Sequence, residues 1–310
     1  MSVTALCASH TPLRDYCSPG AAIEQELAAV FTELREWTRA CAPDLLVVIG
    51  PDHFNGFFYR LMPGFYVGAR ARGVGDWQTR RGPLPTEPAL AEHCVQALQR
   101  GGSDPALSFD MVVDHGCTQI IEQLFDWSSC PPVLPVFINC AAPPLPPLPR
   151  VDAFGTALGH FLAGLDRQVL VIGSGGLSHD PPIPVLHDAP PAVRERLIQG
   201  GDLSVAARNE RQQRVLDDAR RQSAGTSDRT PLNPDWDERF LADLIADQRP
   251  RLLGLDDAAI SAEAGAGGHE IRTWVAAAAC ARAAQATDAK VHYYRAIPEW
   301  VAGYGIATFR

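Results

Sequence analysis

Several features of common protein classes are missing from these 310 residues. Basic residues are not in excess: 27 lysines and arginines face 36 aspartates and glutamates, which gives a formal charge of -9. Because binding to a phosphate backbone requires clustered positive charge, the composition disfavours a nucleic-acid partner. Apolar runs such as 45–49 and 275–281 are far shorter than the roughly 20 residues that cross a bilayer. We therefore expect no membrane partner.

The eight cysteines include no C-x-x-C pair, the spacing typical of zinc and redox sites. The N-terminus also lacks the basic and apolar segments of a secretion signal. We therefore expect a cytoplasmic protein with reduced thiols. Hydrophobic residues make up 46% of the chain and charged residues 20%, and these fractions predict a soluble globular protein with a sizeable core.

Short apolar runs alternate with helix-like stretches, a pattern typical of an α/β fold. We expect a mixed or mostly parallel central sheet with helices on both faces and an active site at the strand ends. The expected strands are 3–8, 45–49, 109–113, 133–138 and 169–172. The expected helices are one from Ser18 and Pro19 to Trp37, an exposed arginine-rich helix over 202–222, and an alanine-rich helix over 271–286.

Residues 1–310 are expected to form a single domain. The stretch 141–149 contains five prolines and therefore predicts a loop, because proline fits neither a helix interior nor a central strand. A two-lobed organisation would divide at this connection, near 141–150.

Four of the nine histidines follow expected strands: His10, His53, His115 and His179. Loops at the carboxyl ends of parallel strands line the ligand crevice of an α/β sheet, so we expect these four imidazoles to converge. The other positions predict ordinary packing or surface roles: His93 and His160 lie in helix-like stretches, and His187 and His292 lie in loop or flank segments.

Two imidazoles and one carboxylate are the ligand set of non-haem Fe(II) oxygenases. Spacing does not identify the carboxylate. Three aspartates each adjoin a histidine, namely Asp52, Asp114 and Asp180, but sequence neighbours point in different directions. We therefore expect them to orient the histidines. His269 and Glu270 are also adjacent, so at most one of the two reaches a common metal.

Other catalytic motifs are absent. The segment from Gly173 to His179 follows an expected strand, but it lacks the Lys-Ser/Thr of a phosphate-binding loop and the third glycine of a dinucleotide fingerprint. The chain has no G-x-S-x-G or H-E-x-x-H motif, which disfavours an α/β-hydrolase and a zinc protease.

Motifs along nearly the whole chain resemble those of the class III (LigB-type) extradiol catechol dioxygenases. They include Ser9-His10-Thr11-Pro12, Pro51-Asp52-His53-Phe54-Asn55-Gly56, Asp114-His115-Gly116, Gly173-Ser174-Gly175-Gly176-Leu177-Ser178-His179, Leu232-Asn233-Pro234, His269-Glu270-Ile271 and Ile297-Pro298-Glu299-Trp300. The resemblance implies that Fe(II) is held by His10, His53 and Glu270. It also implies that His115 and His179 are the acid and the base of catalysis, and we assign the base to His179.

The resemblance further implies that the substrates are a small-molecule catechol and O2. The expected catechol is 3-(2,3-dihydroxyphenyl)propanoate, together with 2,3-dihydroxycinnamate, and the expected product is a ring-opened muconic semialdehyde in aromatic catabolism. Members of the family commonly form homo-oligomers, and we expect the same here.

The charged tail of such a substrate requires a recognition element, for which an arginine is the simplest choice. Arg60 and Arg295 lie near the family-like segments and are the candidates. Three aromatic residues, Phe57, Phe58 and Tyr59, could shape the pocket. The alternatives are the same chemistry on another catechol, a non-catalytic metal-binding scaffold protein, and a zinc-dependent hydrolase that uses the same histidines.

Overall fold

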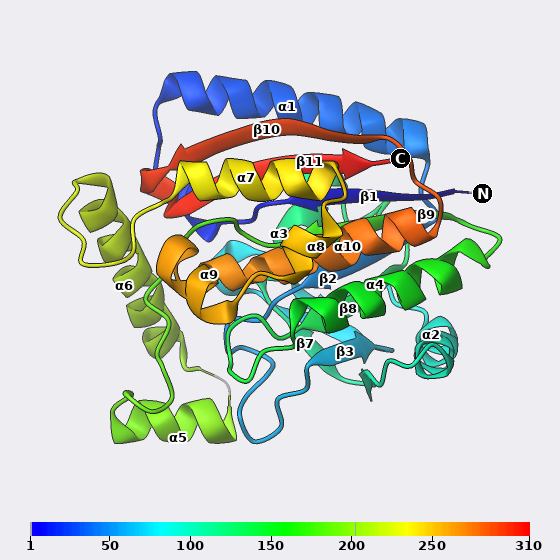
Figure 1. Cartoon of the computed structure of the whole chain (residues 1–310). Helices are drawn as coiled ribbons and strands as arrows, with labels where there is room; N and C mark the ends of the chain where they lie inside the picture. Colours follow the sequence, from blue (N-terminus) through cyan, green and yellow to red (C-terminus); the bar gives the residue numbers. More distant parts are fainter. Residues whose placement is uncertain (1, 202) are drawn as a thin grey trace.

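The computed structural model describes residues 2–201 and 203–310, and its centre is a mixed eight-stranded sheet (Figure 1). The strand order is β10-β11-β1-β9-β2-β8-β3-β6. The strands of this sheet are β1 (Ser2–Ala8), β2 (Leu45–Gly50), β3 (Phe65–Gly68), β6 (Ala106–Ser108), β8 (Val133–Ile138), β9 (Gln168–Ser174), β10 (Ala289–Ile297) and β11 (Ala302–Phe309). Strands β1, β9, β2 and β8 are parallel to one another, and β11 and β3 flank them in antiparallel pairings. The expected α/β class and the mostly parallel centre are confirmed.

A separate three-stranded sheet contains β5 (Arg81–Pro83), β4 (Ala71–Val74) and β7 (Met111–Val113). The expected strand over 109–113 is therefore wrong at its start. A turn, in which the Asp110 backbone N–H donates to the Ser108 hydroxyl at 3.0 Å, separates β6 from β7. Phe109 in this turn is exposed, so its apolar side chain does not mark a buried strand.

Ten helices lie in the described residues; α1 and α3 pack on one face of the main sheet, and α4 and α10 pack on the other. They are α1 (Ala21–Cys41), α2 (Pro88–Arg100), α3 (His115–Leu124), α4 (Leu148–Ala163), α5 (Pro191–Gln199), α6 (Val205–Ser223), α7 (Pro234–Ile245), α8 (Arg249–Leu253), α9 (Asp257–Ala264) and α10 (Ile271–Ala283). Short 3-10 turns are η1 (Pro12–Asp15), η2 (Asp76–Gln78), η3 (Ala266–Glu270) and η4 (Pro298–Trp300). None of these helices is long and apolar enough to cross a membrane.

The core consists of two layers, one on each face of the sheet. Strand β2 shows why: Leu45, Val47 and Ile49 pack with α4 and α10, whereas Leu46 and Val48 pack with α1 and α3. Side chains alternate between the faces of a strand, so a strand that is buried on both faces is a continuous apolar run.

Helices α4 and α10 approach each other closely on one face of the sheet. A Cβ at Gly155 would lie 2.3 Å from the carbonyl oxygen of Ala276, and one at Gly159 would lie 2.2 Å from that of Cys280. Glycine is therefore required at both positions of α4. The alanine-rich helix expected over 271–286 is present as α10 and ends at Ala283.

The setting of His292 and the start of the arginine-rich helix differ from the predictions. His292 lies in strand β10 rather than in a flanking segment, because β10 extends as far as Ile297. Helix α7 begins at Pro234 after a cap by Asn233, so Trp236 lies inside this helix. The expected helix over 202–222 is present from Val205, and residue 202 lies outside the described residues.

Candidate metal centre and substrate cavity

Three of the expected site histidines follow neighbouring parallel strands of the main sheet. His10 follows β1, His53 follows β2 and His179 follows β9. The carboxyl ends of these strands lie at one edge, where α5 and α6 are also found (left in Figure 1). His115 reaches the same place from the first turn of α3. The structure thus brings together all four histidines that were expected to converge.

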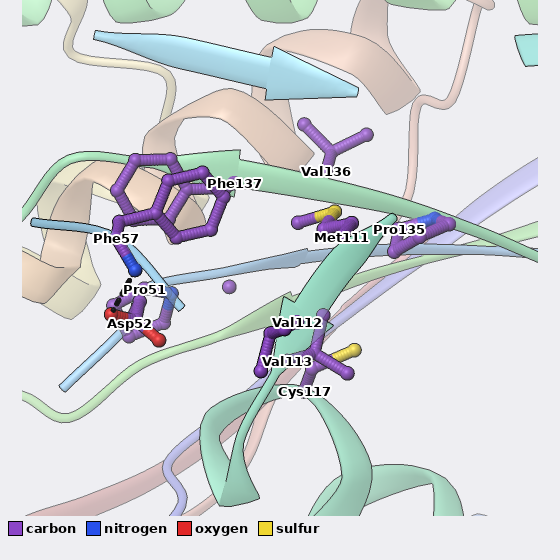
Figure 2. A pocket seen from close by; sticks show the side chains of 11 residues that line it. Pro51, Asp52, Phe57, Met111, Val112, Val113, Cys117, Pro135, Val136 and Phe137 are labelled. Carbon is purple, nitrogen blue, oxygen red and sulfur yellow. Dashed lines mark hydrogen bonds between the residues drawn. The ribbon is translucent and has the colours of Figure 1, made fainter. Parts of the chain in front are cut away.

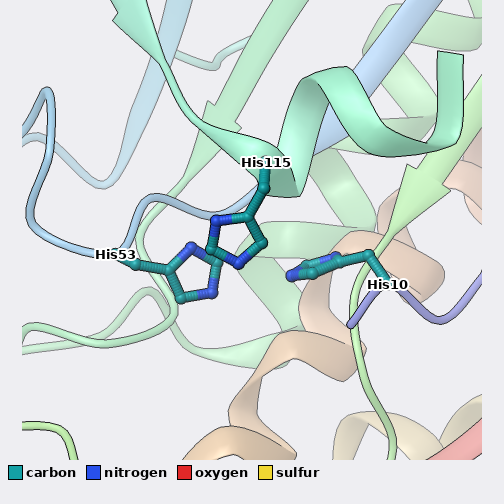
Figure 3. Close-up of side chains that lie close together, drawn as sticks. All are labelled: His10, His53 and His115. Carbon is teal, nitrogen blue, oxygen red and sulfur yellow. The ribbon is translucent and has the colours of Figure 1, made fainter. Parts of the chain in front are cut away.

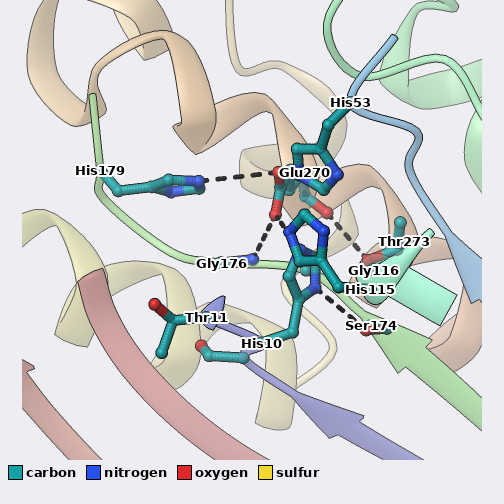
Figure 4. A network of polar contacts seen from close by, with 12 residues as sticks. His10, Thr11, His53, His115, Gly116, Ser174, Gly176, His179, Glu270 and Thr273 are labelled. Atoms are coloured by element: carbon teal, nitrogen blue, oxygen red, sulfur yellow. Dashed lines mark hydrogen bonds and ion pairs between the residues drawn. The ribbon is translucent and has the colours of Figure 1, made fainter. Parts of the chain in front are cut away.

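Glu270 lies among these imidazoles (Figure 4). Its carboxylate oxygens are 3.7 Å from Nε2 of His10, 3.4 Å from Nε2 of His53 and 3.6 Å from Nε2 of His179. It also accepts a hydrogen bond from the backbone N–H of Gly176 at 2.6 Å. The glutamate side chain is buried, so it presents a carboxylate to three ring nitrogens away from bulk water.

The ring nitrogens of His10, His53 and His115 form a compact group (Figure 3). Their nearest nitrogen atoms lie within 4.8 Å of one another. The His53 and His115 rings stack with centroids 4.3 Å apart, and His10 meets both rings edge-on. His115 therefore borders the space that His10, His53 and Glu270 enclose.

The Nδ1 atom of every one of the four histidines is hydrogen-bonded. The partners are the Ser174 hydroxyl for His10 at 3.0 Å, Asp114 for His53 at 3.1 Å, Asp76 for His115 at 2.5 Å and the Leu177 carbonyl for His179 at 2.9 Å. Partners of this kind fix the ring orientation and leave Nε2 free. Each histidine can thus offer Nε2 to a ligand or metal.

Glycines on two segments make room for the His179 ring. A Cβ at Gly176 would lie 2.5 Å from Cε1 of the ring, and a Cβ at Gly267 would lie 2.2 Å from Nε2. The backbone N–H of Gly267 also donates to the His179 carbonyl at 2.9 Å. The glycine-rich segment after β9 therefore allows a close approach of backbone to an imidazole rather than to a phosphate.

The aspartates beside the histidines have different roles. Asp114 precedes His115 in the sequence but orients His53 instead. The Asp114 carboxylate accepts from both the backbone N–H and Nδ1 of His53. It also caps α3 by accepting from the backbone N–H of Gly116. Within the described residues, Asp180 forms no hydrogen bond or ion pair with a histidine side chain, and its carboxylate accepts from the backbone N–H groups of Thr230 and Ala266.

Asp52 shapes the loop that carries His53. Its carboxylate accepts from the backbone N–H groups of Asn55, Gly56 and Phe57 at 3.0, 2.9 and 3.1 Å. Figure 2 shows this carboxylate beside a void of about 10 Å³, large enough for about one water molecule, that is lined mainly by apolar side chains. Burial and the nearby Asp114 raise the pKa of Asp52 to about 7.

His269 points away from the centre. Its Nδ1 accepts from the Arg272 guanidinium at 2.8 Å, and its Nε2 lies 2.8 Å from the Ser261 hydroxyl. The geometry therefore leaves Glu270 as the residue of this pair that faces the other histidines. The four remaining histidines are not among the residues that line the cavity above this centre; they are His93, His160, His187 and His292.

The charges of the centre stabilise one another against the cost of burial. Burial alone would raise the pKa of Glu270, but His10 and His179 outweigh it and hold that pKa well below its usual value. Burial would lower the pKa of His53 and of His179, yet Asp114 raises the first and Glu270 raises the second. At His10 burial prevails and lowers the pKa to about 3. The centre therefore combines an ionised carboxylate with a neutral imidazole, and both are good donors to a cation.

A cavity of about 740 Å³ opens above the centre. Its aromatic walls are Phe54, Trp77 and Trp300 rather than the expected residues 57–59. Phe57 instead stacks on Phe137 with centroids 4.0 Å apart. A cavity of this size suits a small organic ligand.

The arginines expected to hold a substrate tail do not line the cavity. Arg60 is exposed, and Arg295 is paired on the surface with Glu26. The cavity is lined instead by Arg196 of α5, by Arg208, Arg211 and Arg214 of α6, and by Arg229. The expected exposed character of α6 is therefore wrong for one face, because positions three apart recur on the same side of a helix.

Sequence reasoning also missed the residues that hold His10 and His115. Ser174 lies inside the glycine-rich motif and ends β9, which pairs with the strand that precedes His10. Its position in this motif was therefore a signal in the sequence that could have identified it. Asp76 lies in η2, outside every expected strand and motif, and it accepts from both the backbone N–H and Nδ1 of His115. No local sequence pattern links Asp76 to His115.

Comparison with known proteins adds sequence relatives to this geometry. The family described as "Catalytic LigB subunit of aromatic ring-opening dioxygenase" matches residues 4–305. A protein of Mycolicibacterium smegmatis named 2,3-dihydroxyphenylpropionate/2,3-dihydroxicinnamic acid 1,2-dioxygenase is 43% identical, over 99% of this chain and 98% of its own length. A protein of the same name from Photorhabdus laumondii is 44% identical, over 99% and 97% of the two chains.

One solved structure is similar in fold. It is the crystal structure of an uncharacterized protein from Escherichia coli K12, with a TM-score of 0.53 and 16% identity over 98% of both chains. At this identity the likeness concerns the fold alone.

Proposed function

The chain belongs to the LigB family of extradiol ring-cleaving dioxygenases, and from this premise we propose that it opens the ring of 3-(2,3-dihydroxyphenyl)propanoate with Fe(II) and O2. The same reaction would apply to 2,3-dihydroxycinnamate and would give a muconic semialdehyde-type product. The names of the relatives support the choice of substrate. The observation that carries the proposal is the buried Glu270 carboxylate within 3.7 Å of the Nε2 atoms of three histidines that line the cavity.

The metal ligands in this proposal are His10, His53 and Glu270. Two imidazoles and one carboxylate without sulfur form the donor set of non-haem Fe(II) oxygenases, which leave positions open for substrate and O2. The hydrogen bonds at Nδ1 of both histidines direct Nε2 towards Glu270. Fe(II), when bound, supplies the redox and Lewis-acid chemistry of the reaction.

We assign the role of base to His179. Its Nδ1–H donates to the Leu177 carbonyl, which can only accept, so the neutral ring has a free lone pair at Nε2. This nitrogen lies 3.6 Å from the Glu270 carboxylate. It is therefore placed to take a proton from a catechol hydroxyl that is held beside Glu270.

We assign the role of acid to His115. Asp76 accepts hydrogen bonds from its backbone N–H at 3.0 Å and from its Nδ1 at 2.5 Å, and together these bonds fix the ring. The ring stacks on His53 at the cavity wall. A proton at Nε2 can then be donated to an oxygen atom that gains negative charge as the ring opens.

The whole of residues 1–310 is proposed to act as one domain. The main sheet takes β1, β2 and β3 from before the proline-rich segment at 141–150 and β9, β10 and β11 from after it. This shared sheet supports the proposal of a single domain over a division near 141–150.

The test begins with anaerobic reconstitution with Fe(II), followed by addition of the catechol and air. We expect a yellow ring-opened product that forms with one O2 consumed per catechol. Iron binding without cleavage of any catechol would favour a scaffold protein. Tight binding of zinc alone, without O2 uptake, would overturn the mechanism.

The division of roles is tested by iron content. His10→Ala and Glu270→Ala should lose iron, whereas His115→Gln and His179→Gln should retain it and lose about 10²- to 10⁴-fold in kcat. His160→Gln on the outer part of α4 is the matched control and should change neither quantity. Equal iron loss in His179→Gln and Glu270→Ala would refute the division.

A further inference from the structure

The cavity above the centre has an unusual excess of positive side chains. Five arginines line it, whereas the carboxylates among its lining residues are Asp76, which is bonded to His115, and Glu210. Further along α6, Arg220 and Arg221 pair with Asp217 and Asp218. Among residues 2–201 and 203–310, none of the five cavity arginines forms such an ion pair. An anionic ligand in the cavity would therefore not compete with an ion pair of these five side chains within the described residues.

Two of these arginines contact the loop that carries His53. The guanidinium of Arg211 donates to the His53 carbonyl and lies 3.4 Å from the Asn55 amide oxygen. The guanidinium of Arg196 donates to the carbonyl of Phe54 at 3.0 Å. Two cations thus bind consecutive carbonyls beside a proposed iron ligand.

The hydrogen-bonding capacity of this pair is not used up by the protein. The Nε atom of Arg196 is buried and has no hydrogen-bond partner in the part of the chain that the structure describes. Its guanidinium also lies 5.7 Å from the Phe58 ring centre, which fixes one face. Arg196 and Arg211 donate to carbonyls of the same loop, so two like charges lie close together at the cavity wall. A bound anion would relieve both the missing hydrogen bond and the repulsion.

Resting on the proposed function, we propose that Arg196 and Arg211 bind the side-chain carboxylate of the substrate and thereby select catechols that carry one. A catechol held at Glu270 lies next to His53, and the propanoate chain leaves the ring beside one hydroxyl. Its carboxylate extends only a few bonds from the centre, which matches arginines attached to the His53 loop. Guanidinium groups suit this role because they offer paired donors to a carboxylate.

The rest of the cavity fits the remainder of such a molecule. Trp77, Ile183 and Trp300 supply apolar walls for an aromatic ring. The arginines then provide the few polar groups that fix orientation in a mostly apolar pocket. Arg196 and Arg211 are therefore specificity-determining residues, separate from those that hold iron or move protons.

The first experiment compares two substrates that differ in the carboxylate. With Fe(II)-loaded protein, kcat/KM is measured for 3-(2,3-dihydroxyphenyl)propanoate and for 3-propylcatechol. Hydrogen bonds to charged groups predict that Arg196→Gln and Arg211→Gln lose about 10- to 150-fold on the carboxylate substrate, mostly through KM. We expect about twofold change or less on 3-propylcatechol, unchanged iron content, and partial recovery in Arg211→Lys. Arg220→Gln, on the exposed part of α6, is the matched control and should behave as wild type.

An equal loss on both substrates would overturn the proposal, because the arginines would then serve the metal centre or the fold. No loss on either substrate would place the carboxylate elsewhere.

A second measurement does not depend on turnover. Binding of 3-phenylpropanoate by calorimetry should weaken by about 10-fold or more in Arg196→Gln and Arg211→Gln and stay unchanged in Arg220→Gln. This result would support the carboxylate site even if the wild type cleaved neither catechol. Failure to cleave either catechol would refute the proposed function but not the carboxylate site. Unaltered binding in both cavity variants would refute the carboxylate site.

Discussion

Gly267→Ala should disable His179 without touching a metal ligand. The added Cβ would lie 2.2 Å from Nε2, 2.3 Å from Cδ2 and 2.4 Å from Cε1 of the ring. Nonbonded heavy atoms prefer separations of about 3.5 Å or more, so the ring must move by roughly 1 Å. The backbone at Gly176 is also close to the ring, because a Cβ at that position would lie 2.5 Å from Cε1.

A displacement of about 1 Å at a catalytic group can reduce a rate about 100-fold, and complete loss of a general base costs about 10²- to 10⁴-fold. We therefore expect kcat to fall within this range while the iron content stays near one per chain. The assay is O2 uptake with the propanoate catechol, together with iron analysis and a thermal melt that confirms folding.

The matched control is Gly64→Ala, where the nearest atom to the new Cβ is 3.8 Å away. It should keep wild-type activity. In the double variant Gly267→Ala/His179→Gln we expect no loss beyond that of His179→Gln alone, because both changes remove the same group. Activity above a tenth of wild type in Gly267→Ala, or multiplying losses in the double variant, would show that the glycine does not act through His179.

Two further predictions concern Asp76 and the contact between α4 and α10. Asp76→Asn removes the carboxylate that accepts from both the backbone and Nδ1 of His115, so kcat should fall about 10- to 100-fold with iron retained; parallel loss of iron would contradict this role. Gly155→Ala places a Cβ 2.3 Å from the Ala276 carbonyl and should lower the free energy of unfolding by about 1–3 kcal/mol in urea denaturation. Gly164→Ala, where the nearest atom is at 3.4 Å and φ is -82°, is the control and should change stability little.

The sequence predicts the parts of the site that follow from sheet topology. His10, His53 and His179 each follow an apolar run, and parallel strands deliver such positions to one edge. Asp76 could not be found in this way, because it belongs to a 3-10 turn whose position depends on the small sheet formed by β4, β5 and β7.

Helix α6 illustrates a second limit. Its arginines at 208, 211 and 214 have the spacing of one helical face, and in a sequence such a face usually indicates exposure to water. The structure packs this face over the cavity, where Arg208 donates to the Val74 carbonyl and Arg211 to that of His53. Charged residues that cover a polar cavity have the same periodicity as charged residues on a surface, so only the tertiary arrangement separates the two cases.

The different roles proposed for the histidines follow from their positions around Glu270 rather than from their tautomers. The Nδ1 partners of His53, His115 and His179 are carboxylates or a carbonyl, which only accept, so each neutral ring carries its hydrogen on Nδ1 and offers Nε2. His179 contacts the Glu270 carboxylate, whereas His115 contacts the rings of His10 and His53. Figure 4 shows the two on different sides of Glu270. A molecule bound between them can therefore lose a proton at one side and receive one at the other, without a tautomer change in either ring.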